Sequence, residues 1–175
     1  ITIFTIFIKH ELMSIIIPLY QTGNYIMTQV YQYKLTVPES AVDINGHVNN
    51  VEYLQWMQWA AVLHSDIRGC TKATLDVGAT WVVRMHHIEY LRPAFAGDTV
   101  VILTWVSDFR RVRSLRKYKV IRCKDKAVLV EGKTDWVFVD AKTGRLRSIP
   151  KNVMMKFKLL PEVLEPEILN SLNFS

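Results

Sequence analysis

Five segments of the chain alternate apolar and polar residues, which is the pattern of strands that bury one face. They cover residues 30–37, 81–93, 99–109, 114–123 and 127–140. Pro38 and Pro93 end the first two segments, because proline cannot donate the hydrogen bond that a sheet requires. Short polar stretches separate the later segments. The pattern therefore predicts long antiparallel strands joined by tight turns.

Residues 50–65 follow a different pattern, with apolar residues three and four positions apart, as on one face of a helix. Four of them are expected to form its buried face, namely Val51, Leu54, Met57 and Ala61. Trp56 and Trp59 widen the apolar surface, so we expect the helix to be covered on several sides. Asn49 or Asn50 can cap its start, because a short side-chain oxygen accepts a hydrogen bond from a free helical N–H. Residues 66–79 are expected to form a loop.

The order strand, helix and then four strands indicates an α+β fold, in which one long helix lies against a curved antiparallel sheet. No internal repeat or low-complexity linker interrupts it, so we expect a single domain over residues 27–175. A single sheet of this kind leaves an edge strand unpaired and apolar surface uncovered. We therefore expect a homodimer or homotetramer, with two sheets joined edge to edge.

Residues 1–26 differ from the rest of the chain. ITIFTIFI and IIIPLY are apolar, but the polar residues KHE at 9–11 separate them. A membrane-spanning helix needs about 20 apolar residues in a row. A secretory signal needs a basic start, one longer apolar run and a small-residue cleavage site, and these are not found in that order. We expect no membrane span, and an N-terminal extension that is poorly ordered or adds a strand.

Composition limits the remaining possibilities. Half of the 175 residues are apolar, which is enough for a hydrophobic core. Cys70 and Cys123 are too few for a disulfide framework and lack the spacing of metal ligands, so we expect no metal or cofactor and a reducing, cytoplasmic location. The net charge of +6 is compatible with nucleic acid, an anionic membrane, an anionic small molecule or simple solubility.

The stretch DINGHVNNVEY at 43–53 gathers short polar side chains just before the apolar helix. Asp43 would offer a carboxylate beside an apolar element, where it could act as a general base or a nucleophile. His47 lies four residues further on and could orient a water molecule, polarise a carbonyl or share the proton. Asn45, between them, could hold the water or the carboxylate. These three residues are the predicted catalytic group.

The backbone of the same stretch could stabilise negative charge. Gly46 allows close approach of a substrate because it has no Cβ. The N–H groups of Gly46, His47 and Val48 should lie near the start of the helix, where unpaired donors suit an oxyanion. An alternative is purely structural, since Asp, Asn and Gly are common in turns and Asn caps helices. On that alternative, Asn50 would be a cap only.

The longer stretch DINGHVNNVEYLQW resembles the active-site loop and helix start of hotdog-fold thioesterases. Nine residues match the pattern of the plant acyl-ACP thioesterases: Asp43, Asn45, His47, Val48, Asn49, Asn50, Val51, Tyr53 and Trp56. The bacterial acyl-CoA thioesterases of the 4-hydroxybenzoyl-CoA type share the Asp, the Gly and the Tyr. EYLRPAFAGDTV at 89–100 resembles the strand-turn-strand of both groups. The resemblance implies a hotdog fold that hydrolyses acyl-CoA or acyl-ACP, with Asn49, Asn50 and Tyr53 near the substrate.

The chain also departs from the plant pattern. Pro93 and Ala94 occupy the positions at which the plant enzymes carry an acidic residue and a cysteine, so the resemblance implies no cysteine mechanism here. The plant enzymes contain two hotdog units, whereas 175 residues suffice for one. Both departures favour the bacterial acyl-CoA group or a small relative of the acyl-ACP enzymes.

Residues 110–117, RRVRSLRK, carry five cations in eight positions. Arg110, Arg111 and Arg113 could lie at the mouth of an acyl tunnel and bind the phosphates of coenzyme A or the acidic face of acyl carrier protein. The alternative is a solvated hairpin. His86 and His87 are adjacent in a strand, so they point to opposite faces and cannot form a metal pair.

Two further functions stay open at this point. A hotdog dehydratase or hydratase would use a His and an acid on different elements, which the compact polar loop does not favour. A non-catalytic module that binds acyl groups or nucleic acid would agree with the positive charge. However, the basic run is not interleaved with the aromatic residues that single-strand binding needs, so we expect no nucleic-acid partner.

Overall fold

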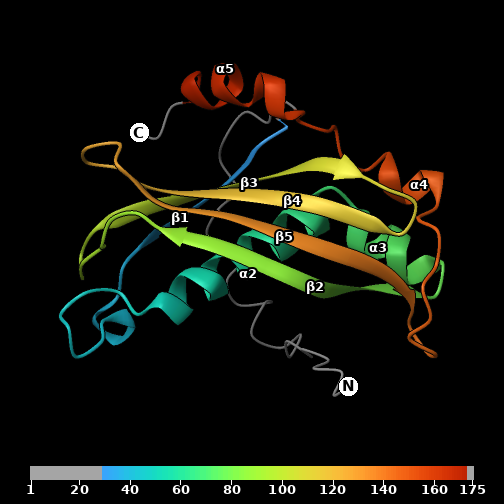
Figure 1. Cartoon of the computed structure of the whole chain (residues 1–175), viewed down its shortest axis with the longest axis horizontal. Coiled ribbons are helices and arrows are strands. Elements are labelled where there is room, and N and C mark those ends of the chain that lie inside the picture. The colour runs from blue at the N-terminus through green and yellow to red at the C-terminus, as the bar shows by residue number, and fades with distance from the viewer. Residues whose placement is uncertain (1–28, 173–175) are drawn as a thin grey trace.

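A computed structural model of the chain describes residues 29–172 (Figure 1). The predicted extension 1–26 and the expected domain start at residue 27 lie outside the described residues. The helices and strands in chain order are β1 (Tyr31–Thr36), η2 (Glu39–Ala41), α2 (Asn50–Ile67), α3 (Cys70–Asp76), β2 (Ala79–Tyr90), β3 (Thr99–Phe109), β4 (Arg113–Arg122), β5 (Val128–Asp140), α4 (Lys151–Met154), η3 (Glu162–Leu164) and α5 (Glu165–Asn170).

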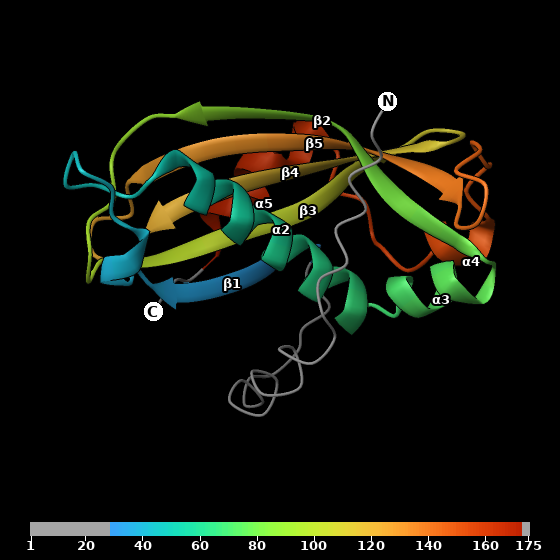
Figure 2. The same cartoon turned by 90° about the horizontal axis from the view of Figure 1, so that it is seen from below.

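The five strands form one antiparallel sheet in the order β1-β3-β4-β5-β2. The sheet curves around α2, which crosses its concave face, while α5 lies against the opposite face (Figures 1 and 2). This confirms the predicted α+β fold with one long helix wrapped by an antiparallel sheet. The five predicted strands are all present, each within three residues of its expected bounds.

The expectation of a loop between α2 and β2 is wrong. The loop expected at 66–79 contains α3, a seven-residue helix that is too short to show a repeating pattern. Gly69, with φ +68, lets the chain turn between α2 and α3. The C-terminal region, beyond the last predicted strand, also contains α4 and α5.

The buried face of α2 is rotated from the expected one. It consists of Tyr53, Trp56, Met57, Ala60, Ala61 and His64. Met57 and Ala61 were predicted correctly, but Val51 is 67% exposed. Trp59 is 38% exposed, so the helix is not covered on all sides by residues 29–172. The periodicity misled because α2 carries apolar residues around most of its circumference, and only packing against the sheet selects the inner face.

A buried cation sits between the sheet and the C-terminal half of α2. Arg116 of β4 donates to His64 Nδ1 at 3.0 Å, to Thr104 Oγ1 at 3.2 Å and to Ser65 Oγ at 3.4 Å. Its guanidinium also lies 5.1 Å from the centre of the Phe157 ring. Burial lowers the pKa of His64 to about 2, and the positive charges of Arg116 and Arg68 act in the same direction. The imidazole is therefore neutral and accepts from the guanidinium.

The polar loop before α2 is held by one residue of the turn between β2 and β3. The Ala94 carbonyl accepts the Val48 N–H at 2.9 Å. The Ala94 N–H donates to Tyr53 Oη at 3.0 Å, and Ala94 and Tyr53 are both buried. Burial raises the pKa of Tyr53, although the bond from Ala94 opposes that shift. Loop, helix and turn are thereby fixed to one another at one end of the sheet.

None of the helices within residues 29–172 combines the length and the apolar character that crossing a membrane requires.

We predict that acid destabilises the fold through His64. The unfolded chain binds a proton on this imidazole near its ordinary pKa of 6.5, whereas the folded chain binds one only near 2. The free energy of unfolding should therefore fall as the pH drops below about 6.5, by at most about 1.4 kcal/mol per pH unit, and this contribution is constant above that range. Urea unfolding of wild type and His64→Gln across this range measures it. His87→Gln, on the exposed face of β2, is the control and should keep the wild-type slope; equal slopes in all three proteins would contradict the prediction.

The Ala94 contact predicts a second stability difference. Tyr53→Phe leaves the buried Ala94 N–H without its acceptor, which should lower the free energy of unfolding by about 1–3 kcal/mol. Tyr90→Phe is the matched control, because its hydroxyl donates to the exposed Asn50 carbonyl and water can replace it. A loss in Tyr53→Phe no larger than that in Tyr90→Phe, measured by urea unfolding at neutral pH, would refute this role for the hydroxyl.

Candidate active site

The loop from Asp43 to Asn50 joins η2 to α2 and folds on its own polar groups. Asp43 Oδ1 accepts the Asn45 N–H at 2.8 Å, and its Oδ2 lies 3.4 Å from the Asn45 side-chain nitrogen. The Asp43 carbonyl accepts the Gly46 N–H at 3.0 Å, and Gly46 adopts φ +79, which favours glycine. This turn fixes the Asp43 carboxylate and brings Asn45 to it.

His47 stands beside the carboxylate without bonding to it. Its Nδ1 lies 4.0 Å from Asp43 Oδ1 and 3.3 Å from the Val48 carbonyl oxygen. The side chains of His47 and Asp43 are 39% and 24% exposed, respectively, so the carboxylate is shielded rather than open to solvent. A small rotation of the imidazole, or one water between the two groups, would connect them.

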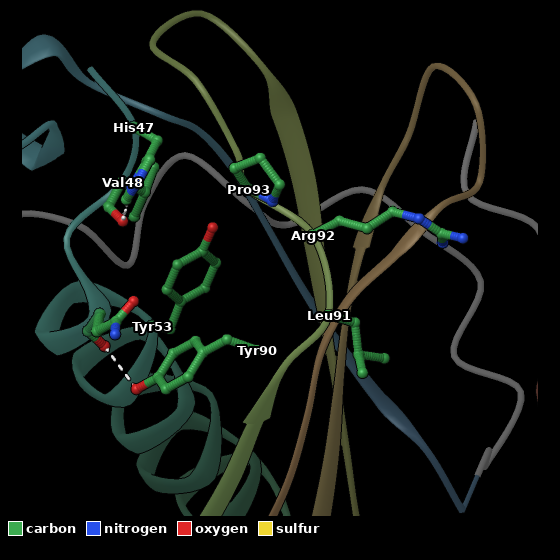
Figure 3. Close-up of a pocket in the computed structure, with 8 residues that line it drawn as sticks. His47, Val48, Tyr53, Tyr90, Leu91, Arg92 and Pro93 are labelled. Carbon is green, nitrogen blue, oxygen red and sulfur yellow. Dashed lines mark hydrogen bonds between the residues drawn. The ribbon is translucent and has the colours of Figure 1, made fainter. Parts of the chain in front are cut away.

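A pocket of about 260 Å³ opens at this end of the helix (Figure 3). Its lining comes from the polar loop, the start of α2 and the end of β2: His47, Val48, Asn50, Tyr53, Tyr90, Leu91, Arg92 and Pro93. The rings of Tyr53 and Tyr90 lie 5.8 Å apart, edge to face, and form an aromatic wall. Asp43 does not line the pocket itself, but its carboxylate lies 4.0 Å from Nδ1 of the lining residue His47. The predicted residues Asn50 and Tyr53 thus share one cavity with His47.

The predicted oxyanion donors are only partly free. The Gly46 N–H donates to the Asp43 carbonyl, and the Val48 N–H donates to Ala94. These two amides are therefore already used, because the loop closes on itself and docks on the turn. The His47 N–H has no acceptor among residues 29–172. The expectation of three donors narrows to the His47 N–H, beside which the Asn50 N–H at the start of α2 also has no acceptor among residues 29–172.

Asn49, rather than Asn50, is the helix cap. Its side-chain oxygen accepts the Val51 N–H at 3.0 Å, and its backbone is extended, as at other N-caps. Asn50 lines the pocket, and its carbonyl accepts the Tyr90 hydroxyl at 3.1 Å. The interpretation of Asn50 as only a cap is wrong, and the cap occupies the Asn49 oxygen that was expected near the substrate.

The predicted arginine cluster lies at the wrong end of the sheet. Arg110, Arg111 and Arg113 surround the turn between β3 and β4, opposite the polar loop (Figure 1). The two ends are separated by the length of β3, about 35 Å for 11 residues. All three side chains have local partners: Asp108 for Arg110, Ser148 for Arg111 and Asp135 for Arg113. Within one chain, these arginines do not line the pocket.

Arg92 is the cation that the structure does bring to the pocket. It follows β2 directly, and its side chain extends away from the two tyrosines in Figure 3. Its Nη1 lies 3.4 Å from the Val128 carbonyl. The stretch EYLRP contained the available signal, because a strand that ends at a proline places its last side chains at the rim of the sheet.

Other candidate ligands do not converge. In the region from residue 29 to 172, no three His, Cys, Asp or Glu side chains gather as a metal site would require. His86 Nδ1 pairs with Thr134 at 2.9 Å, and His87 Nε2 pairs with Glu89 at 2.9 Å on the opposite face of β2. The thiols of Cys70 and Cys123 are both free.

Known proteins resemble this chain in sequence and in fold. A chloroplastic acyl-[acyl-carrier-protein] hydrolase of Cuphea viscosissima is 33% identical over 73 residues, which is 42% of this chain. The chain spans about a fifth of the curated relatives that it matches, 18% of one and 22% of another. The structure of the 12:0-ACP thioesterase from Umbellularia californica superposes with a TM-score of 0.69 at 24% identity, over 83% of this chain and 58% of that one.

A bacterial structure has nearly the same extent as the fold described here. The probable thioesterase YbaW of Escherichia coli superposes with a TM-score of 0.68 at 20% identity, over 72% of this chain and 95% of that chain. The chain therefore has the hotdog fold and matches one unit of it. The family model of the thioesterase-like superfamily matches residues 37–157, more than half of the sequence. The chain thus belongs to the thioesterase-like superfamily.

Proposed function

We propose that this chain hydrolyses acyl thioesters, acyl-CoA or acyl-ACP, to a free acid and a thiol. The observation that carries the proposal is a carboxylate and an imidazole, Asp43 and His47, which lie 4.0 Å apart, with His47 lining a pocket beside the start of α2. Family membership supports the reaction class. The named relatives that act on acyl carrier protein support an acyl-ACP substrate, and the pocket itself does not distinguish the two thiols.

In this mechanism Asp43 acts as the general base or the nucleophile. As a base, its carboxylate takes a proton from a water whose oxygen attacks the thioester carbonyl carbon. The tetrahedral intermediate then collapses, the C–S bond breaks, and the sulfur leaves with the proton. As a nucleophile, the Asp43 carboxylate attacks the carbonyl carbon, the C–S bond breaks, and the thiolate leaves and takes a proton from water. Water then hydrolyses the mixed anhydride, which releases the free acid and restores the carboxylate. Asn45 holds the carboxylate in either case, and His47 faces the pocket where it can orient the water or polarise the carbonyl.

The oxyanion would be stabilised by backbone donors. The His47 N–H lacks an acceptor in the described part of the chain, and α2 starts three residues later at Asn50. The first N–H groups of a helix point outward and carry partial positive charge. A donor of this kind is typically worth about 3–4 kcal/mol of barrier.

The acting form would be a homodimer or homotetramer. β2 pairs only with β5 among the described strands, so one edge of its 12 residues is unpaired. A long open edge favours pairing with another strand, and a second copy supplies an identical one. The free thiols of Cys70 and Cys123 support a reducing compartment such as the cytoplasm.

Asp43→Asn is predicted to lower kcat/KM for acyl-CoA or acyl-ACP hydrolysis by about 10²–10⁴-fold, because the amide can neither accept the proton nor attack. The measurement is thiol release over a panel of acyl thioesters. Asp66→Asn, at an exposed position on the same polypeptide near the far end of α2, is the matched control and should keep wild-type activity. Full activity in Asp43→Asn would rule out this base.

Asp43 and His47 are further predicted to act as a unit. His47→Gln should reduce kcat/KM, and the double variant with Asp43→Asn should lose little more than Asp43→Asn alone. Comparing the four proteins in one double-mutant cycle measures the coupling. Losses that simply multiply would mean that the imidazole works independently of the carboxylate.

A further inference from the structure

A glycine in the middle of β5 is explained by one side chain of α2. Gly132 is flanked by Ile88 of β2 and Tyr118 of β4, on the face toward the helix. Its backbone is not left-handed, so the conformation itself does not require glycine. A Cβ at this position would lie 2.6 Å from the terminal methyl carbon of Met57 and 3.1 Å from its sulfur. Gly132 is therefore a notch in the sheet that Met57 fills.

Met57 lies directly behind the pocket. It follows Tyr53 by one helical turn on the same face of α2, and Tyr53 forms the pocket wall. On the sheet side, Val130 pairs with the pocket residue Tyr90, and Gly132 is two residues further along the strand. This displacement is about 7 Å inward. A group that passes between the two tyrosines and continues along α2 would meet Met57 next.

The residues that face α2 beyond Met57 and Gly132, further from the pocket, are polar. Thr134, two residues beyond Gly132, pairs across the sheet with His86 and Arg116. Arg116 is buried and donates to His64 of α2, as described above. An apolar chain gains little by displacing hydrogen bonds from a buried cation. The distance along β5 from the residue beside Tyr90 to Thr134 is about 13 Å over four strand residues, and this is the length that an apolar chain could occupy if the side chains between them moved aside.

We infer that Met57, seated on Gly132, sets how far an acyl chain enters between α2 and the sheet. This inference rests on the proposed thioesterase function and names its specificity-determining residue. Methionine is unbranched and adaptable, so it can fill the notch when no ligand is present and move aside for an apolar chain. The length of acyl group that the protein accepts is then decided by the volume at positions 57 and 132, with the Arg116 layer as the limit.

The test changes this volume in both directions. Met57→Ala enlarges the space and should raise the ratio of kcat/KM for tetradecanoyl-CoA over octanoyl-CoA by about tenfold or more, since pocket contacts of one or two methylenes are worth about that factor. Gly132→Ala adds a methyl group against Met57 and should lower the same ratio. Met57→Val, a smaller change, should give an intermediate ratio and keeps the test valid if Met57→Ala does not fold.

Leu103→Ala is the matched control. Leu103 is equally buried, but it lies in the cluster on the opposite face of the sheet, under Leu160. Leu103→Ala should lower the urea midpoint of unfolding to a similar extent as Met57→Ala without changing the ratio. Unchanged ratios in both Met57 variants and in Gly132→Ala, with hydrolysis retained, would overturn the inference and leave the proposed function standing.

A binding measurement separates the two proposals. Acyl-CoA thioethers, which cannot be hydrolysed, are titrated by tryptophan fluorescence, for which Trp56 next to Tyr53 is a suitable reporter. If wild type hydrolyses no thioester but the preferred thioether length shifts in the Met57 and Gly132 variants, the proposed function fails and the inference holds. If wild type neither hydrolyses thioesters nor binds thioethers, both are overturned.

Discussion

The site depends on a single backbone residue, Ala94, and on what it holds together. Its carbonyl oxygen accepts the Val48 N–H of the polar loop, and its N–H donates to the Tyr53 hydroxyl of α2. The turn lies about 40 residues along the chain from the loop and the helix, which follow each other directly. Two hydrogen bonds in a buried environment join the turn to both of them. Without this contact the carboxylate of Asp43 would sit on a flexible turn, and the aromatic wall of the pocket would lose its position.

The α2 helix has a different role at each end. At its start Asn49 caps the helix, and Asn50 and Tyr53 line the pocket. In its middle Met57 occupies the notch of Gly132. At its end the side chains of His64 and Ser65 accept hydrogen bonds from the buried Arg116 guanidinium. The residues that face the concave side of the sheet therefore change from aromatic to aliphatic to charged along one helix.

Much of the fold follows from local pattern. Alternation located the five strands, and the polar stretch at 43–53 marked the candidate site, because short polar side chains in front of an apolar helix are unusual there. The rest depended on contacts between distant segments. Val51 looked buried because α2 is apolar on most sides, and only the sheet selects the face that includes Tyr53. The amides of Gly46 and Val48 looked free because their acceptors are set by the folded turn and by Ala94.

The basic run at 110–117 shows the same limit most clearly. Strand periodicity predicts that these residues flank a turn. It does not predict at which end of the sheet, relative to the polar loop, that turn lies. Arg116, within the same run, is buried on the helix-facing side, while Lys117 reaches the other face and pairs with Glu165 at 2.8 Å.

The most direct measurement of the central claim is thiol release from acyl-CoA and acyl-ACP by the purified chain. The account predicts catalytic turnover with at least one of them, and thiol release no faster than in buffer for the whole panel would contradict it.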